Sequence, residues 1–396
     1  MKSDINISHL FKGKHYQFRT FCIVLLLIFL VFLFKKGIFG SFLPHLPQSV
    51  SDRMPWWTQA EIFPERNEDV PYYAYNMLPD DEKHLYDDIY SAINHYSSVL
   101  RTDTLSENDI KKIYEAVRAD HAEIYWVDGF TIRKHTSNGR VTRLDFIPQY
   151  TMDKKTAVSY AKKIRSCADT ILRFAPASGS DYEKSKWVYE YLFSNMTYNR
   201  DAKDNQNILS SILYHETACR GFSTAAQYLL RELGIESVII VGTWNDTPHA
   251  WNMIKLDGDF YYMDTTLSQY YLDSNSDKEP VIDYDYLNIT TQELLKQHTI
   301  DVSFLLPSCT KDKDNYYAAE HKYITTYDEA IFKEMILSAY KDGQQYFSVK
   351  FSSAALYQTY RKYLNESIAS ILPSDGILSY NSNPALCCIM IEFSGQ

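Results

Sequence analysis

Apolar positions recur with a helical period in several segments of this chain. The stretch 81–100 places Leu85, Ile89 and Tyr96 on one face of a helix. Ser180 and Glu183 have the spacing of a capping box, and apolar pairs continue on one face from there to about residue 196. The pattern therefore predicts one helix within 81–100 and a second that begins after Ser180.

A further amphipathic segment begins at Cys219. Its apolar residues at positions 222, 226, 229, 230 and 233 fall on one side, and Gly234 stands where a glycine commonly ends a helix. Thr217 is the expected N-cap residue, which places Cys219 in the first helical turn. Free backbone N–H groups and the positive end of the helix dipole favour a thiolate over a thiol at that position, and Arg220 adds a cation.

Three strand-like runs follow this helix, at 237–243, 249–256 and 259–265. The last two flank Asp257-Gly258, a strong signal for a two-residue hairpin turn. Pairing across such a turn sets Asp264 opposite Trp251, with His249 two residues away on the same face. His249 and Asp264 then become diagonal neighbours about 7–8 Å apart at Cα. A three-residue loop would break this arrangement.

The flanking segments predict a mixed α and β architecture. Residues 124–133 suggest two short strands around Asp128-Gly129. The tail predicts a helix from about 327, a strand at 345–351, a helix at 354–371 and a final strand that begins at Cys387-Cys388. We expect His298 and His321 to be surface or locally hydrogen-bonded residues.

The amino-terminal segment predicts a membrane anchor. Residues 21–34 contain no charge and no helix breaker, which favours an uncleaved signal anchor over 20–39; a cleaved signal peptide is the rival interpretation. Four basic residues precede the apolar run 21–34 and two lysines follow it, so the bulk of the chain is expected outside the cell membrane. Five prolines within 44–71 predict a semi-rigid spacer.

Charge and cysteine usage exclude several function classes. The 396 residues carry a net charge of −10, and the first forty are basic, so the exported part is strongly acidic and unsuited to a nucleic acid partner. Six cysteines without a CxxC pair fit neither a disulfide scaffold nor a zinc module. His215-Glu216-x-x-Cys219 resembles a zinc motif, but it needs one continuous helix, which Thr217 interrupts. We expect no metal and no cofactor.

A cysteine at a helix start, together with a carboxylate set against a histidine, is the arrangement of cysteine acyl-transfer enzymes. The stretches ACRGFSTAAQYLLRELGIESVIIVGT and HAWNMIKLDGDFYYMDTT resemble the transglutaminase-like superfamily, which has a papain-related cysteine fold, in its exported bacterial type. The resemblance covers about 180–306. It implies that Cys219 is the nucleophile, His249 the general base and acid, and Asp264 the residue that orients the imidazole. It names no second oxyanion donor, for which Tyr214 is a weak candidate. We expect Trp251 to pack in the core under the hairpin, with a place in the wall of an apolar cleft as the alternative.

The predicted fold class is α+β, with the cysteine helix packed on an antiparallel sheet that carries the histidine and the aspartate. The expected domains are a cytoplasmic tail (1–19), the anchor (20–39), the spacer (40–71), an accessory region (72–150), the catalytic domain (151–325) and a small α+β domain (326–396). The expected function is a membrane-anchored cysteine peptidase, amidase or acyltransferase that forms a thioester on peptide or carboxamide substrates, including cell-wall peptides. The alternative is a non-catalytic envelope binding module that retains the fold.

Overall fold

The structure is a computed structural model that describes residues 62, 69–270, 281–373 and 376–394. Its amino-terminal region contains three helices and a three-stranded antiparallel sheet of order β1-β3-β2. These elements are α3 (Tyr73–Met77), α4 (Asp80–Asn94), β1 (Leu100–Thr102), α5 (Glu107–Asp120), β2 (Val127–Ser137) and β3 (Arg140–Tyr150). The helix expected within 81–100 is confirmed as α4, which ends before Tyr96 because that residue has a positive φ of 65°.

The expected hairpin around Asp128-Gly129 is wrong. These two residues lie inside β2, where the register with β3 shifts between Val127 and Phe130. The chain instead reverses at Asn138-Gly139, whose φ angles of 51° and 74° suit a two-residue turn. A glycine at a strand irregularity and a glycine in a turn give the same local sequence signal, so the short pattern could not distinguish them.

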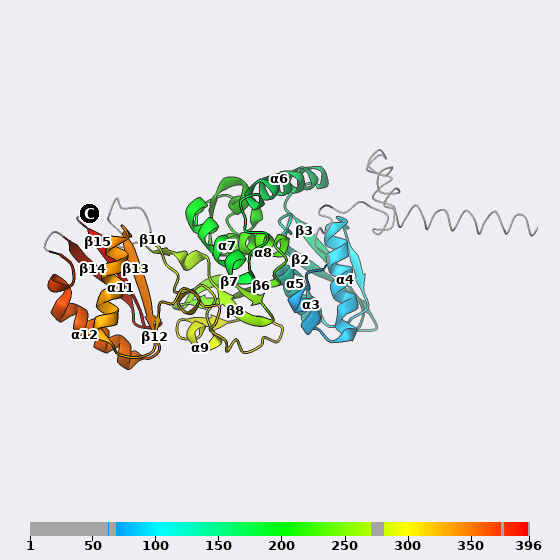
Figure 1. Ribbon diagram of the computed structural model, residues 1–396. Coiled ribbons are helices and arrows are strands. Elements are labelled where there is room, and N and C mark those ends of the chain that lie inside the picture. Colours follow the sequence, from blue (N-terminus) through cyan, green and yellow to red (C-terminus); the bar gives the residue numbers. More distant parts are fainter. Residues whose placement is uncertain (1–61, 63–68, 271–280, 374–375, 395–396) are drawn as a thin grey trace, which may run out of the picture.

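The central part of the chain surrounds a four-stranded antiparallel sheet of order β11-β6-β7-β8. Helix α8 packs on β6 and β7, with α7 beside it (Figure 1). The elements are α6 (Lys154–Leu172), α7 (Asp181–Asn195), β4 (Thr197–Tyr198), η3 (Leu209–Tyr214), β5 (Glu216–Thr217), α8 (Cys219–Glu232), β6 (Ser237–Trp244), β7 (Thr247–Leu256), β8 (Asp259–Met263), η4 (Thr266–Ser268), β9 (Gln269–Tyr270), β10 (Val281–Ile282), α9 (Thr291–Leu294) and β11 (His298–Ile300).

Several local predictions for this part are confirmed. Ser180 and Glu183 form a reciprocal capping box at the start of α7. Gly234 follows α8 with a φ of 86°, and the next amide closes on Leu230 O at 2.9 Å, as in a glycine-terminated helix. The β7–β8 hairpin turns at Asp257-Gly258, both with positive φ, and pairs Leu256 with Asp259.

The carboxyl-terminal region forms a second, smaller α+β unit, drawn in orange to red in Figure 1. Its four-stranded sheet has the order β12-β13-β15-β14, and α11 and α12 contact β13. The predicted helix at 354–371 is confirmed, whereas β14 was not foreseen because its polar sequence ILSYNSN lacks a strand pattern. The elements are α10 (Tyr316–Ala319), β12 (Tyr323–Ile324), α11 (Glu329–Lys341), β13 (Tyr346–Phe351), α12 (Ala354–Ile371), β14 (Ile377–Asn383) and β15 (Cys388–Ser394).

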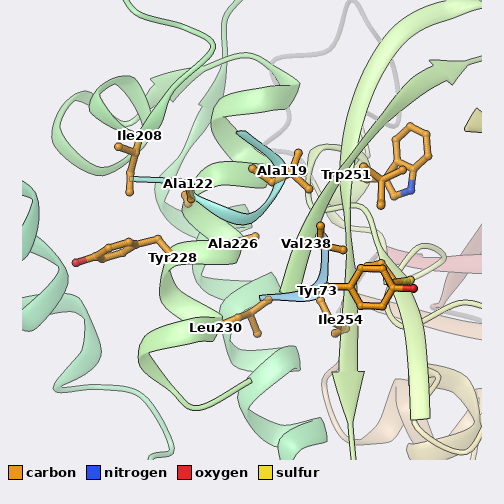
Figure 2. Close-up of a cluster of buried hydrophobic side chains, with 14 of the residues drawn as sticks. Tyr73, Ala119, Ala122, Ile208, Ala226, Tyr228, Leu230, Val238, Trp251 and Ile254 are labelled. Atoms are coloured by element: carbon orange, nitrogen blue, oxygen red, sulfur yellow. The ribbon is translucent and has the colours of Figure 1, made fainter. Parts of the chain in front are cut away.

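Two apolar cores hold these regions together. One joins the amino-terminal helices to α8 and the central sheet, and Figure 2 shows Tyr73 of α3 beside Val238 of β6. The other lies inside the carboxyl-terminal unit and includes Phe332, Val349 and Ile389. Leu386 and Cys388 belong to the first core, so the carboxyl-terminal unit packs directly against the central part.

Within the described residues, no helix is both long and apolar enough to cross a membrane. The expected anchor at 20–39 and the spacer up to residue 61 lie outside the described part of the chain.

Candidate active site

Helix α8 presents Cys219 at its first position. The expected cap at Thr217 is wrong: Ala218 occupies the N-cap position and provides no side-chain cap. Thr217 is paired in β5, and its buried hydroxyl donates to Asn205 O at 2.9 Å and meets the hydroxyl of Ser210 at 2.6 Å. The first-turn N–H groups of α8 are therefore not used by a capping side chain, which leaves them available near the sulfur.

The glycine two residues after Cys219 allows the preceding strand to approach the helix closely. A Cβ at Gly221 would lie 1.7 Å from Thr217 Oγ1 and 2.9 Å from Thr217 Cβ. Only a residue without a side chain fits there. This contact fixes how β5 enters α8, and hence where Cys219 stands.

The β7–β8 hairpin brings His249 and Asp264 together, as its pairing predicts. His249 Nε2 lies 2.7 Å from Asp264 Oδ2, and the two side chains are only 7% and 1% exposed. Asp264 Oδ1 accepts hydrogen bonds from the backbone amides of Thr266 and Leu267 at 3.1 and 3.4 Å. The carboxylate is thus held from both sides and fixes the orientation of the imidazole ring.

The protonation of His249 depends on this carboxylate and on Cys219. Burial disfavours the charged ring, but the charge and hydrogen bond of Asp264, together with a hydrogen bond and charge from Cys219, raise the pKa of His249 to about 10. Burial alone would raise the pKa of Asp264, yet the charges and hydrogen bonds of His249 and His298 hold it well below its usual range. Cys219, His249 and Asp264 thus interact in series in the order that nucleophilic catalysis uses.

His298 is a residue of this site that sequence reasoning missed. It is 2% exposed, so a surface position is wrong, whereas the expected local hydrogen bond is present between its Nδ1 and Leu294 O at 3.3 Å. Its Nε2 lies 3.1 Å from Asp264 Oδ2, a contact that the sequence did not predict. Strand β11 pairs His298 with Trp244 of β6, which sets its ring on the face that carries His249. Thirty-four residues separate the end of β8 at Met263 from the start of β11 at His298, so no local pattern could fix this register.

His249, Asp264 and His298 also form a group whose ligand atoms lie within 4.8 Å of one another, a spacing that a metal ion could use. However, both histidines already place Nε2 at hydrogen-bonding distance from the same carboxylate oxygen, at 2.7 and 3.1 Å. We interpret the group as a hydrogen-bonded network. The zinc-like pattern His215-Glu216-x-x-Cys219 does not lie on one helix, because His215 has a φ of 59° and Glu216 belongs to β5.

Aromatic rings enclose the histidines. Trp251 is fully buried, with its ring centroid 6.0 Å from that of His249 and 4.9 Å from that of His298. Trp244 lies 6.3 Å from the His249 ring by the same measure. Tyr214, the weak oxyanion candidate, is 46% exposed at the end of η3, and its hydroxyl meets Tyr160 of α6 at 3.5 Å.

Two cavities border the elements of this site. The first, of 710 Å³, lies between α5, β6 and the start of α8 and contains Arg220. The second, of 300 Å³, is lined by Trp244 and Tyr286 together with the buried carboxylates Asp283 and Asp285. Neither cavity was foreseen, because each combines residues from segments far apart in the sequence.

The comparison with curated proteins gives no match. Among solved structures, one is described as "a TGase": it shares 15% identity and a TM-score of 0.25, covering 45% of this chain and 51% of its own. Another, described as a "putative cysteine protease" from Cytophaga hutchinsonii, shares 15% identity and a TM-score of 0.22, covering 35% and 62%. The chain thus spans about half to three fifths of these proteins.

A family model described as the transglutaminase-like superfamily matches residues 169–265. This segment runs from α6 through the Asp264 end of the β7–β8 hairpin, so it contains α8 with Cys219 and the hairpin with His249. The chain therefore carries a transglutaminase-like core within these residues.

Proposed function

We propose that this protein is a membrane-anchored, extracytoplasmic cysteine enzyme that acts on peptide or carboxamide bonds. Cys219 is the nucleophile, His249 the general acid and base, and Asp264 the residue that orients the imidazole. The observation that carries the proposal is the hydrogen bond of 2.7 Å between His249 and buried Asp264, with Cys219 near enough to His249 to help raise the pKa of its ring. Its substrates are proteins or peptides of the cell envelope, including cell-wall peptides.

The proposed reaction has two steps. The Cys219 sulfur attacks the carbonyl carbon, and collapse of the tetrahedral intermediate breaks the C–N bond while His249 gives its proton to the departing amine. The acyl group then remains on Cys219 as a thioester. Water attacks this thioester, His249 accepts the proton, and the free acid leaves with the sulfur restored as thiolate. The Cys219 amide at the start of α8 supplies one donor to the oxyanion.

The second cavity favours an amine as an alternative acyl acceptor. Asp283 and Asp285 are 8% and 5% exposed, and Asp285 accepts from Tyr317 Oη at 2.5 Å and Asn383 Nδ2 at 2.9 Å, both neutral donors. Burial and the neighbouring charge of Asp285 raise the pKa of Asp283 well above its usual value. An ammonium group would add a counter-charge to that of Lys350, which acts on Asp285 but is ion-paired with Glu293. Trp244 offers that group an aromatic wall beside His249.

Product formation from N-acyl peptide carboxamides tests the proposal. We expect the full chain to release amine or ammonia, and we expect Cys219→Ser and His249→Gln each to lower the rate by at least about a thousandfold. Cys167→Ser is the matched control because Cys167 is also a free, half-buried thiol. Addition of the amine dansylcadaverine shows whether water or an amine accepts the acyl group. A dansylated product indicates transfer to the amine, and the free acid alone indicates hydrolysis. A substrate panel with no product in the wild type would favour the non-catalytic binding module.

A further inference from the structure

The 710 Å³ cavity next to α8 is built from both the amino-terminal region and the transglutaminase-like core. Helix α5 contributes Tyr114 and Arg118, strand β6 contributes Ile239 and Val241, and α8 contributes Arg220. The wall is otherwise largely apolar or aromatic where it is buried, including Tyr125, Val127 and Phe304.

Two guanidinium groups, those of Arg118 and Arg220, share this cavity, and neither is paired with a carboxylate of the described residues. Arg118 Nη1 donates to the carbonyl oxygens of Ile124 and Val127 at 2.7 and 3.1 Å, and Arg220 Nη2 makes one long contact to Arg118 O at 3.4 Å. Arg220 Nε is buried and finds no hydrogen-bond partner among the residues that the structure describes. Across residues 69–270, 281–373 and 376–394, no carboxylate oxygen lies within ion-pair distance of either group.

The charges around the cavity leave its interior positive. Burial, and then the charge of Arg118, lower the pKa of Arg220 to about 10, so the two cations repel each other in a poorly solvated place. Of the acidic residues that line the cavity, Glu115, Asp128 and Asp301 are exposed to solvent. Asp204 is half-buried, and within the described residues no ion pair joins it to either guanidinium group. An anion between the two guanidinium groups would relieve their repulsion and satisfy the unpartnered Nε.

The cavity adjoins the proposed nucleophile. Arg220 follows Cys219 directly in the first turn of α8. Asn205, which also lines the cavity, accepts hydrogen bonds through its carbonyl oxygen from the amide of Ala218 and the hydroxyl of Thr217, both at 2.9 Å. Asn205 in the wall of the cavity is therefore hydrogen-bonded to the two residues that directly precede Cys219.

We infer that this cavity binds a free carboxylate group of the substrate between Arg118 and Arg220. A planar carboxylate matches the paired N–H groups of a guanidinium, and the apolar wall suits a hydrophobic side chain next to that carboxylate. This inference rests on the proposed function, because it specifies the substrate: a peptide or amide whose free carboxylate lies within about two residues of the reacting carbonyl, given the adjacency of Arg220 and Cys219. Such a carboxylate occurs at a peptide's carboxyl end.

Direct binding tests this inference without any chemistry. The full chain with Cys219→Ser is titrated with 3-phenylpropionate and with 3-phenylpropionamide, which differ only in the carboxylate. We expect the acid to bind at least tenfold more tightly than the amide. Equal affinities would overturn the inference, and this comparison needs no change in the cavity. A lower Kd for inorganic phosphate than for the acid would also overturn it, because the site would then be a phosphate site.

A second arm assigns the effect to Arg220. Arg220→Met keeps an unbranched side chain in the cavity, and Arg140→Met removes an exposed cation as the matched control. We expect the tenfold preference to disappear in the first variant and to remain in the second; a preference that survives in Arg220→Met contradicts the assignment.

If the preference is absent while the wild type still cleaves carboxamides, the inference falls and the proposed function stands. If the preference holds while Cys219→Ser loses no activity, the proposed function falls and the carboxylate site stands.

Discussion

Replacing Asp264 by Asn tests whether this carboxylate controls the charge of His249. The asparagine has nearly the same shape and keeps an oxygen for the amides of Thr266 and Leu267, so the change removes mainly the negative charge. Burial of His249 then acts almost unopposed and favours the neutral ring, because Cys219 alone remains to raise its pKa. We therefore expect the pKa of His249 to fall.

The size of the fall follows from the contact. A hydrogen bond to a charged group is worth about 1.5–3 kcal/mol, which corresponds to roughly one to two pKa units, and the buried charge adds to it. A fall of at least about two units takes the pKa of His249 from about 10 to about 8 or below. At pH 8.5 the protonated fraction of the ring would change from about 97% to about 24% or less.

NMR of protein labelled with ¹³C at histidine Cε1 measures this directly. The chain has eleven histidines, and His249→Gln identifies the signal of His249. Asp259→Asn is the matched control, since it removes a carboxylate from the same hairpin without touching the histidine. If the His249 signal titrates at the same pH in the wild type and in Asp264→Asn, the reasoning is refuted.

Two further predictions concern groups that support the site. His298→Phe keeps an aromatic ring against Trp251 but removes one hydrogen bond to Asp264. We therefore expect kcat to fall about tenfold to hundredfold with little change in KM. The control His84→Phe, at an exposed position, leaves both kcat and KM unchanged. Equal kinetics for the two variants would contradict a positioning role. Gly221→Ala places a methyl group against buried Thr217, and we expect the free energy of unfolding in urea to fall by about 1–3 kcal/mol. An unchanged midpoint of urea unfolding would contradict this, because it would mean that β5 moves away from the methyl group without a loss of stability.

Local sequence signals predicted the parts of the site that depend on short-range pairing. The turn at Asp257-Gly258 fixes the register of its two strands, so the neighbourhood of His249 and Asp264 followed from the sequence alone. Gly234 likewise marked the end of α8. In both cases a turn or helix end restricts the backbone to one arrangement, and the side chains follow from it.

Long-range contacts could not be predicted in this way. His298 reaches Asp264 only because β11 joins the far edge of the sheet beside β6, a pairing that no turn specifies. Arg118 and Arg220 are about a hundred residues apart in the chain and share a cavity only because α5 packs on β6. The cap of α8 was mistaken for a related reason: the hydroxyl of Thr217 is used by Asn205, which the local motif did not reveal.

The most direct test of the central claim is the rate at which iodoacetamide alkylates Cys219 at pH 6, read from the mass of its tryptic peptide. Cys167 in the same sample provides the reference, because both thiols are free and half-buried. If His249 activates the Cys219 sulfur, Cys219 reacts at least about tenfold faster than Cys167 in the wild type and loses this advantage in His249→Gln. A Cys219 rate that His249→Gln leaves unchanged would contradict the account.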